Sequence, residues 1–472
     1  MLFTSFTYVL FLCVVIPIVR RTEGVWRERV LLAASLVYYA AWDVRFLVVL
    51  LALGVFTFAA GRRIAAAREA KARPRFATAT APIAAILLVL AAFKYTRWLV
   101  DIENGLFGTA FTLPKLILPL GISFFTFECV SYLLDVQKGA AELLPLRRFL
   151  LFPTYWPHLV AGPILRIKEF SLELENLRRP TWRETLAGLD RVVIGLVKKV
   201  VFADSLAVFV DQGFGATPGT VGGVDGWALT VAFALQIFFD FSGYSDIAIG
   251  VSRMVGIRMP ENFNLPYHAE SPSDFWNRWH MTLSRWIRDY LFFPLNLRAG
   301  RRVWLRYVFL VLVMTLVGLW HGAGAGFVVW GAWHGTLMVL HRVLQNRIGR
   351  LDDGPRIPLE RLGRLVSLVL LVAGWVPFRA PTLAAAGAML RAMFTLRGLR
   401  PAYSINDYLL VLACIVGYVV VSPRVERFVQ REPQGPNVGA VAFWARAPLY
   451  ALAVQLLFMF DRSNVAFIYF QF

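Results

Sequence analysis

The stretch LVGLWHGAGAG, residues 316–326, places His321 directly before a series of alternating small residues. It lies within residues 307–341, a run that contains no Asp, Glu, Lys or Arg. About 20 apolar residues are enough to cross a bilayer, so the imidazole is predicted to lie at membrane depth. The glycines loosen the helix, and non-helical backbone is tolerated there only where protein or a water-filled cavity satisfies it. His321 is therefore a candidate catalytic residue.

The whole chain has the composition of a membrane protein. Of its 472 residues 58% are hydrophobic and 17% are charged, whereas a soluble protein has about 25% charged residues. Apolar blocks recur from residues 4–19 to residues 447–460. These blocks predict an all-α, polytopic integral membrane protein with roughly 10–13 membrane helices. Re-entrant and amphipathic helices are expected to surround a central cavity, in a single membrane-embedded domain over residues 1–472.

The net charge of +19 has a membrane explanation. Lys and Arg gather in short loops, at residues 20–29, 62–75, 298–306 and 342–364. Basic short loops stay on the cytoplasmic side and favour anionic membrane lipids. Since no basic domain with interleaved aromatic residues stands outside the apolar blocks, nucleic acid is not expected as a partner.

Residues 271–293 are predicted to form one amphipathic helix. Ser271 is the cap, Pro272 takes the first helical position and Asp274 follows three residues after the cap. His280 would then lie near Asn277 at i−3 and near a serine at i+4. We expect this helix to end at Pro294 and to lie at the membrane interface or to line a cavity.

Two carboxylates, Asp240 and Asp246, occur in the apolar segment 227–252. Unpaired acids are costly at membrane depth, so these must pair, cap a broken helix or face water. The architectural interpretation, in which they hold loop amides or nearby arginines, is favoured over direct proton transfer. His334 and His158 are each open to a packing or a site interpretation. No metal site is predicted, because the three cysteines are scattered and no HExxH motif occurs.

The last residues, FIYFQF at 467–472, allow two interpretations. Aromatic residues gather at membrane interfaces, so the segment can be an anchor. Tyr469 also offers the nucleophilic side chain among these six residues, and a tyrosine can carry an acyl group covalently when a base is within reach. Tyr469 is therefore a candidate acyl carrier.

Five motifs in fixed order resemble a known family. They are LPLGISFFTF (118–127), PHLVAGPI (157–164), DFSGYSDIAIG (240–250), FWNRWH (275–280) and LWHGAG (319–324). The series resembles the membrane-bound O-acyltransferases, especially the bacterial branch that acetylates polysaccharides such as alginate. The resemblance covers nearly the whole chain. One departure is WVPFRA at residues 375–380, where the family usually has WVFFRA; the proline is expected to shift a helix end without affecting the histidine motifs.

The resemblance implies roles for particular residues. His321 matches the catalytic histidine of the family, and His280 matches a second polar position in the preceding re-entrant region. The C-terminal segment is similar to a terminal tyrosine motif linked to acyl hand-over in related cell-wall systems. Supporting positions are expected at Asn277, Asp240, Asp246, Trp320, Gly322 and Gly324.

The reaction that follows is an acetyl transfer. The donor is expected to be acetyl-CoA or another cytoplasmic thioester, with no bound cofactor. The acetyl group would pass outward for O-acetylation of an exported or cell-wall polysaccharide, with a periplasmic O-acetyltransferase as partner, in the bacterial inner membrane. His321 would act as general base, His280 and Asn277 would orient the reactants, and the amides of Gly322 and Gly324 would approach the oxyanion.

Two other classes of protein fit parts of the pattern. A non-enzymatic transporter or flippase for a lipid-linked saccharide would use a similar aqueous cavity, with histidines and acids as relays. A membrane glycosyltransferase would need an acidic external site, for which Asp101 and Glu103 are candidates.

Overall fold

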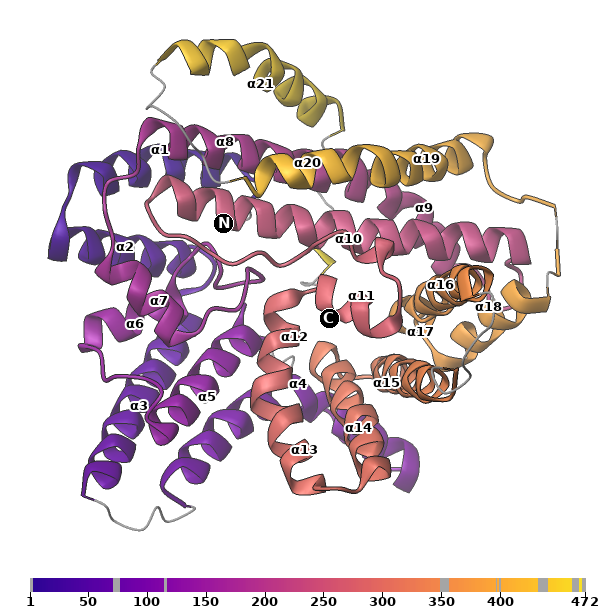
Figure 1. The fold of residues 1–472 in the computed structure, drawn as a ribbon, viewed down its shortest axis with the longest axis horizontal. Coiled ribbons are helices and arrows are strands. Elements are labelled where there is room, and N and C mark those ends of the chain that lie inside the picture. The colour runs from indigo at the N-terminus through magenta and orange to yellow at the C-terminus, as the bar shows by residue number, and fades with distance from the viewer. Residues whose placement is uncertain are drawn as a thin grey trace. The chain divides into compact units, whose positions relative to one another are not determined.

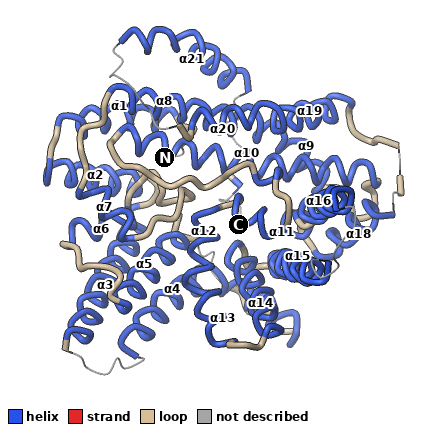
Figure 2. Tube along the Cα trace, viewed as in Figure 1, coloured by secondary structure: helices blue, strands red, loops and turns tan. Residues whose placement is uncertain are grey.

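The computed structural model describes residues 3–70, 77–113, 117–348, 356–395, 397–398, 400–431, 440–460 and 467–468. Within these ranges every regular element is a helix (Figure 1, Figure 2). The predicted all-α class is confirmed.

The polytopic architecture is also confirmed. Seven helical segments in the described ranges are long and apolar enough to cross a membrane: Val44–Glu69, Thr78–Phe107, Gly223–Met254, Val303–His321, Arg361–Arg379, Ile405–Val429 and Phe443–Phe460. The roughly 10–13 membrane helices expected from the sequence also include apolar blocks that fold into shorter helices. Examples are α1 (Phe6–Arg21) and α2 (Gly24–Ala40), with 16 and 17 residues.

The described residues form two compact units, each assembled from separate stretches of chain. The first unit takes its residues from 1–196, 244–260 and 433–451, and the second from 197–243, 261–432 and 452–472. Helix α10 (Gly223–Met254) contributes to both units. A single acyltransferase domain over residues 1–472 stays a prediction.

Buried ion pairs hold the first unit together. Its further helices are α3 (Val44–Glu69), α4 (Ala77–Phe107), α5 (Ile122–Lys138), α6 (Leu146–Thr154), α7 (Ile167–Glu175) and α8 (Trp182–Leu196). Glu128 of α5 lies 3.1 Å from the His158 Nδ1, and both side chains are buried. Asp246 of α10 accepts a hydrogen bond from Arg191 of α8 at 2.9 Å. Asp246 is thus held by an arginine, as the architectural interpretation expects, because a buried carboxylate persists only when it is paired.

The second unit contains the two histidine motifs. Its helices are η1 (Val197–Ala203), α9 (Asp204–Phe214), η2 (Pro266–His268), α11 (Pro272–Arg278), α12 (Met281–Ile287), η3 (Arg288–Phe292), α13 (Phe293–Ala299), α14 (Val303–His321), α15 (Ala325–Ile348), α16 (Arg356–Ala373), α17 (Trp375–Arg379), α18 (Leu383–Thr395), α19 (Ile405–Val416), η4 (Gly417–Val421), α20 (Ser422–Val429) and the end of α21 (Ala440–Phe460). Elements η1, η3 and η4 are short π-helices, a form that often occurs at functional sites.

Glycines bring α14 and α15 into backbone contact. A Cβ atom at Gly318 would lie 2.0 Å from the Phe327 carbonyl oxygen, and one at Gly331 would lie 2.2 Å from the Met314 carbonyl oxygen. Neither position has room for a methyl group. Small residues at such contacts allow membrane helices to pack closely without a hydrophobic driving force. This hairpin fixes where His321, at the end of α14, lies relative to α15.

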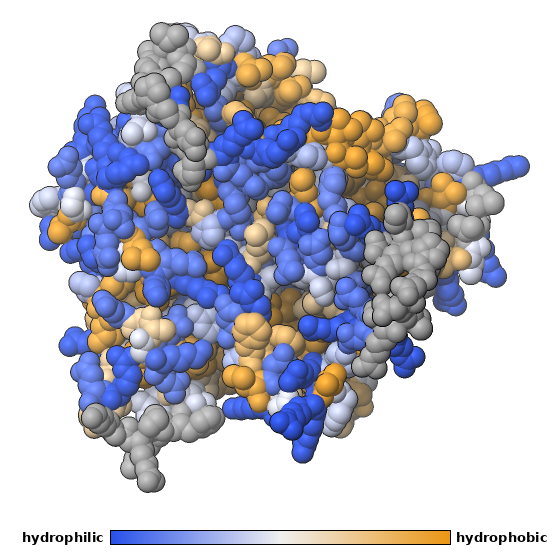
Figure 3. Space-filling view, viewed as in Figure 1, coloured by the Kyte–Doolittle hydropathy of each residue, from blue (hydrophilic) through white to orange (hydrophobic). Residues whose placement is uncertain are grey.

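Helix α19 and η4 present apolar side chains outward. Their exposed residues include Ile405, Leu409, Leu412, Val416, Val419, Val420 and Val421, and Figure 3 shows hydrophobic residues gathered over this part of the second unit. A continuous exposed apolar surface is unusual in a soluble protein. Here it is the expected lipid-facing surface of a membrane-spanning segment.

Gly331→Ala is expected to destabilise the protein. The added methyl group must push Met314 away from α15, and overpacking of this kind costs about 1–3 kcal/mol. Thermal unfolding of the detergent-purified protein, followed by tryptophan fluorescence, measures the fall in Tm. The matched control is Gly387→Ala in α18, where a Cβ meets nothing within 4 Å and the better helix propensity of alanine leaves Tm equal or slightly raised. Equal Tm changes in the two variants would contradict the packing argument.

Candidate functional site

His321 is the last residue of α14. The next residue, Gly322, is extended with φ −162° and ψ 152°, and α15 begins at Ala325. The structure therefore breaks the helix after the histidine, as the small residues predict. The His321 side chain is buried, with 6% of the residue exposed.

Three aromatic rings surround the His321 imidazole. Trp330 of α15 lies perpendicular to it at 5.1 Å between ring centroids, and Phe378 of α17 lies at 5.5 Å. The neighbouring Trp320 ring lies at 4.7 Å. Phe378 follows Pro377, the departure from the family sequence, in a short helix that starts after Gly374. Such surroundings limit the access of water and hold the ring in place.

His280 lies in a break between two helices. The prediction of one continuous helix over residues 271–293 is wrong. Its start is confirmed, because the Ser271 side chain accepts a hydrogen bond from the Asp274 amide at 3.1 Å. The helix then ends at Arg278, and His280 adopts the left-handed conformation with φ 42° before α12 begins. A non-glycine residue with positive φ is strained and is held there by its surroundings.

Asn262 provides the contacts that hold this break open. Its backbone carbonyl accepts a hydrogen bond from the Met281 amide at 2.9 Å. Its side-chain Oδ1 accepts one from the Thr282 hydroxyl at 2.9 Å and lies 3.0 Å from the His280 Nδ1. Because Oδ1 can only accept, the Nδ1 of His280 carries the proton and Nε2 is the basic nitrogen. Burial lowers the pKa of His280 to about 3, so the ring is neutral.

The end of the predicted amphipathic helix is also different. Pro294 does not terminate the segment. The chain continues through η3 into α13, where Pro294 occupies the first turn. Pro294 directly follows the π-helix η3, and both a proline and a π-bulge are usual where a helix departs from regular geometry.

The predicted proximity of Ser284 to His280 is confirmed, because the Ser284 amide donates a hydrogen bond to the His280 carbonyl at 2.9 Å. The proximity of Asn277 to His280 stays a prediction. The Ser284 hydroxyl donates to the Trp279 carbonyl at 3.2 Å. Both Asn277 and Ser284 line a pocket whose lining does not include His280.

The surroundings of the two histidines belong to one aromatic cluster. The Phe241 ring lies 4.7 Å from the His280 ring. The Phe263 ring lies 5.1 Å, between ring centroids, from both the Phe241 ring and the Trp279 ring. The Trp279 ring lies 5.1 Å from that of Trp375, which in turn lies 5.4 Å from the Phe378 ring beside His321. The aromatic cluster therefore connects α10, the α11–α12 break and α17 within the second unit.

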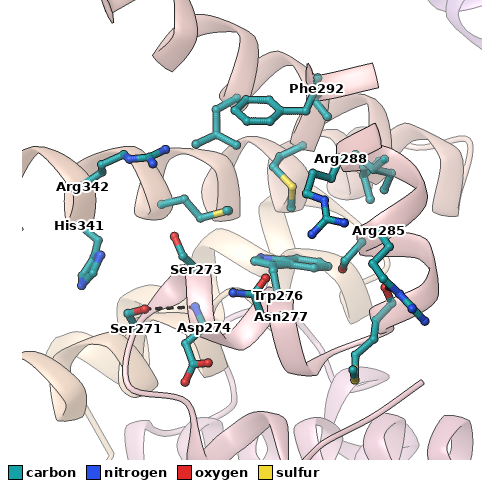
Figure 4. A pocket seen from close by; sticks show the side chains of 18 of the residues that line it. Ser271, Ser273, Asp274, Trp276, Asn277, Arg285, Arg288, Phe292, His341 and Arg342 are labelled. Carbon is teal, nitrogen blue, oxygen red and sulfur yellow. Dashed lines mark hydrogen bonds between the residues drawn. The ribbon is translucent and has the colours of Figure 1, made fainter. Parts of the chain in front are cut away.

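A pocket of about 690 Å³ opens between the α11–η3 segment and the α14–α15 hairpin. Three arginines line it, Arg285, Arg288 and Arg342, and in Figure 4 Arg285 and Arg288 lie on one side of the Trp276 ring while Arg342 lies on the other. Arg288 pairs with Asp289 at 2.8 Å, whereas Arg285 and Arg342 make no ion pair among the described residues. The pocket thus combines apolar walls with cationic side chains.

Trp276 forms the wall between this pocket and the His321 surroundings. Its ring lines the pocket and contacts Trp330 at 5.7 Å and His334 at 5.4 Å. The pocket reaches Val317, one helical turn before His321, and Met281, directly after His280. Neither catalytic candidate lines the pocket itself.

The remaining predicted positions fall into different places. Asp240 lies 2.7 Å from the Lys199 ammonium, again the architectural arrangement. The Gly322 amide donates to the Gly318 carbonyl at 3.4 Å and the Gly324 amide donates to the Gly322 carbonyl at 3.1 Å. Both amides therefore stabilise the turn, and an oxyanion role for them stays a prediction.

Tyr469 lies outside the described residues. In the part of the chain that is described, no three His, Cys, Asp or Glu residues are arranged to hold a metal.

Sequence reasoning did not single out Asn262, Trp330, Phe378 or Lys199. Asn262 and Lys199 are polar residues beside or within apolar segments, and that signal could have identified them as partners of buried groups. The two aromatic residues carry no comparable signal, because aromatic side chains are common throughout the apolar blocks.

The sequence model of the membrane-bound O-acyltransferase family matches residues 42–351, which include both histidine motifs. The chain belongs to this family. It is 38% identical over 433 residues to a probable alginate O-acetylase of Azotobacter vinelandii, covering 89% of this chain and 84% of that protein. It is 40% identical over 401 residues to a probable alginate O-acetylase of Pseudomonas aeruginosa, covering 84% and 75%.

A relative named for a different acceptor is also similar to this chain. The peptidoglycan O-acetyltransferase of Helicobacter pylori is 34% identical over 398 residues, covering 78% of this chain and 74% of that protein. This membrane protein is therefore an O-acyltransferase, an enzyme that transfers acyl groups to hydroxyl groups.

Since His280 is predicted to orient the reactants, Asn262→Ala is expected to slow acyl transfer about 100-fold, the scale of the rate loss when a group at a reaction site is displaced by about 1 Å. The rate is measured in membranes that contain equal amounts of each variant. The matched control, Asn264→Ala, changes an exposed asparagine two residues away and retains the native rate. A native rate in Asn262→Ala would show that the anchoring of His280 is not needed for the reaction.

Proposed function

We propose that this O-acyltransferase takes an acetyl group from cytoplasmic acetyl-CoA and passes it across the bacterial inner membrane for O-acetylation of an exported or cell-wall polysaccharide. The relatives named as alginate O-acetylase and peptidoglycan O-acetyltransferase support this acceptor class. The observation that carries the proposal is a buried imidazole at a helix break, one turn of α14 beyond a pocket lined with arginines.

The pocket suits the donor. Its volume of about 690 Å³ lies in the usual range for cofactor and ligand pockets. Arg285 and Arg342 can bind phosphate groups through charge-assisted hydrogen bonds. The basic loops at residues 298–306 and 342–364 favour a cytoplasmic position for the ends of α14 and α15 that they adjoin. The donor would enter from that side.

His321 would act as general base. The imidazole removes the proton from the acceptor hydroxyl, and the oxygen of that hydroxyl attacks the carbonyl carbon of the thioester. The carbon–sulfur bond breaks, and the leaving thiolate takes the proton from the imidazolium. Assistance of this kind contributes typically about 10²–10⁴ in rate. The thioester must pass Trp276 to reach the imidazole, so this side chain has to move during the cycle.

His280 would orient the reactants. Its Nδ1 is engaged with Asn262, and its neutral Nε2 can accept a hydrogen bond from the attacking hydroxyl. The first acceptor in this scheme is Tyr469, a hydroxyl of a periplasmic O-acetyltransferase partner, or the sugar itself. Membership of an acyltransferase family favours this enzyme over the non-enzymatic flippase considered from the sequence.

His321→Ala is expected to reduce acetyl transfer by at least about 100-fold, with normal amounts of protein in the membrane. Labelled acetyl-CoA supplied to membrane vesicles, followed by recovery of label on protein and glycan, measures the transfer. His268→Ala removes an exposed histidine of η2 and serves as the active control. Full activity of His321→Ala would end the assignment of the base, and saccharide movement without any transferred label would favour a flippase.

Arg285→Gln and Arg342→Gln are each expected to raise the KM for acetyl-CoA at least about tenfold while kcat changes little. Each variant loses a hydrogen bond between charged groups, worth about 1.5–3 kcal/mol. Initial rates across a range of acetyl-CoA concentrations separate the two constants. Arg391→Gln on the exposed surface of α18 is the matched control. An unchanged KM in both pocket variants would place the donor elsewhere.

A further inference from the structure

A buried lysine lies between two buried aspartates in the second unit. The Lys199 ammonium of η1 is 2.7 Å from Asp204 of α9 and 2.7 Å from Asp240 of α10. The three side chains are 1%, 6% and 3% exposed, respectively. Asp240 lies near the middle of the candidate span Gly223–Met254. Ionisable groups at that depth are costly and usually serve a function.

Two residues near the C-terminus, Phe467 and Ile468, contact this cluster. The Phe467 ring covers the Lys199 ammonium at 4.5 Å from its centroid. The Ile468 amide donates a hydrogen bond to the Asp240 Oδ2 at 3.0 Å. Phe467 and Ile468 are 2% and 3% exposed. These two residues are therefore held inside the second unit, more than 200 positions along the chain from the side chains that bind them.

The charges explain why a peptide fits here. One ammonium faces two carboxylates, so the cluster of Lys199, Asp204 and Asp240 carries an excess negative charge when all three are ionised. A buried carboxylate needs hydrogen-bond donors, and the Ile468 amide supplies one to Asp240. An ammonium gains further stabilisation from the face of an aromatic ring. The cluster thus recognises a backbone amide that follows an aromatic side chain.

We propose that Lys199, Asp204 and Asp240 form an internal binding site for Phe467 and Ile468. In this site Lys199 selects an aromatic residue at position 467, and Asp240 binds the backbone at position 468 whatever its side chain. The three residues are positioning residues, because they act through Phe467 and Ile468. By holding the residues directly before Tyr469 they limit where its hydroxyl can go; this consequence rests on the proposed acyl-carrier role.

The site is tested by the accessibility of a cysteine in the full-length chain. Ile468→Cys is introduced together with Cys13→Ser, since Cys13 is exposed whereas Cys129 and Cys414 are buried. The rate of modification by a water-soluble maleimide is then measured in detergent. Phe467→Leu, which keeps an apolar side chain but removes the aromatic face, is expected to raise the rate at position 468 about tenfold. Lys199→Met is expected to do the same, and Lys199→Arg to restore slow modification.

Modification of the buried cysteines distinguishes unfolding of the whole protein from release of Phe467 and Ile468 alone. If Lys199→Met also exposes Cys414, that variant has unfolded and Phe467→Leu decides the question, because it alters only the end of the chain. Modification at position 468 that is fast in the parent protein, or unaffected by Phe467→Leu, would overturn the binding site.

Measuring acetyl transfer in the same variants distinguishes failure of the binding site from failure of the proposed function. Acetyl transfer is expected to fall at least tenfold in Phe467→Leu at equal protein levels. The cysteine measurement requires no catalysis, so it reports on the binding site even if the enzyme uses another donor or acceptor. If Phe467→Leu increases cysteine modification at position 468 but acetyl transfer stays native, the binding site is supported and its role in positioning Tyr469 is overturned.

Discussion

The structure depends on the high cost of polar groups at membrane depth. Each buried acid described above has a partner of opposite charge or a donor: Asp246 has Arg191, Glu128 has His158, and Asp240 has Lys199 and a backbone amide. These pairs join segments of the chain that are 30 or more residues apart in sequence. They contribute less to net stability than to specificity, because desolvation offsets much of the attraction, whereas removing one partner leaves a buried charge unpaired.

Close backbone packing is the second determinant of the site. Glycines at the α14–α15 contact leave no space for a methyl group at Gly318 or Gly331, which sets the positions of His321 and Trp330 relative to each other. The imidazole is then enclosed by rings from α15 and α17. If His321 is the general base, as proposed, these rings screen it from water and protect an acyl group from hydrolysis.

The two histidines are held by different means. His321 is positioned by the end of a helix and by aromatic packing. His280 is positioned by Asn262, which stabilises a left-handed residue and thereby interrupts the amphipathic segment. The interruption directs Asn277 and Ser284 to the arginine-lined pocket. One strained residue thus divides the segment between the arginine-lined pocket and the aromatic cluster.

The sequence by itself determined the all-helical membrane class, the helix break after His321 and the cap at Ser271. These features follow from local composition, since charge-free runs, glycines and capping residues act over a few positions. Only the tertiary structure decided that the helix breaks at His280, that Lys199 is the partner of Asp240, and that Phe467 and Ile468 are bound inside the second unit. Those outcomes depend on contacts between residues far apart in the chain, such as Asn262 with His280 and Asp240 with Ile468. Hydrophobic periodicity contains no information about such partners, because many polar residues could satisfy the same buried group and only the packing of the helices selects one.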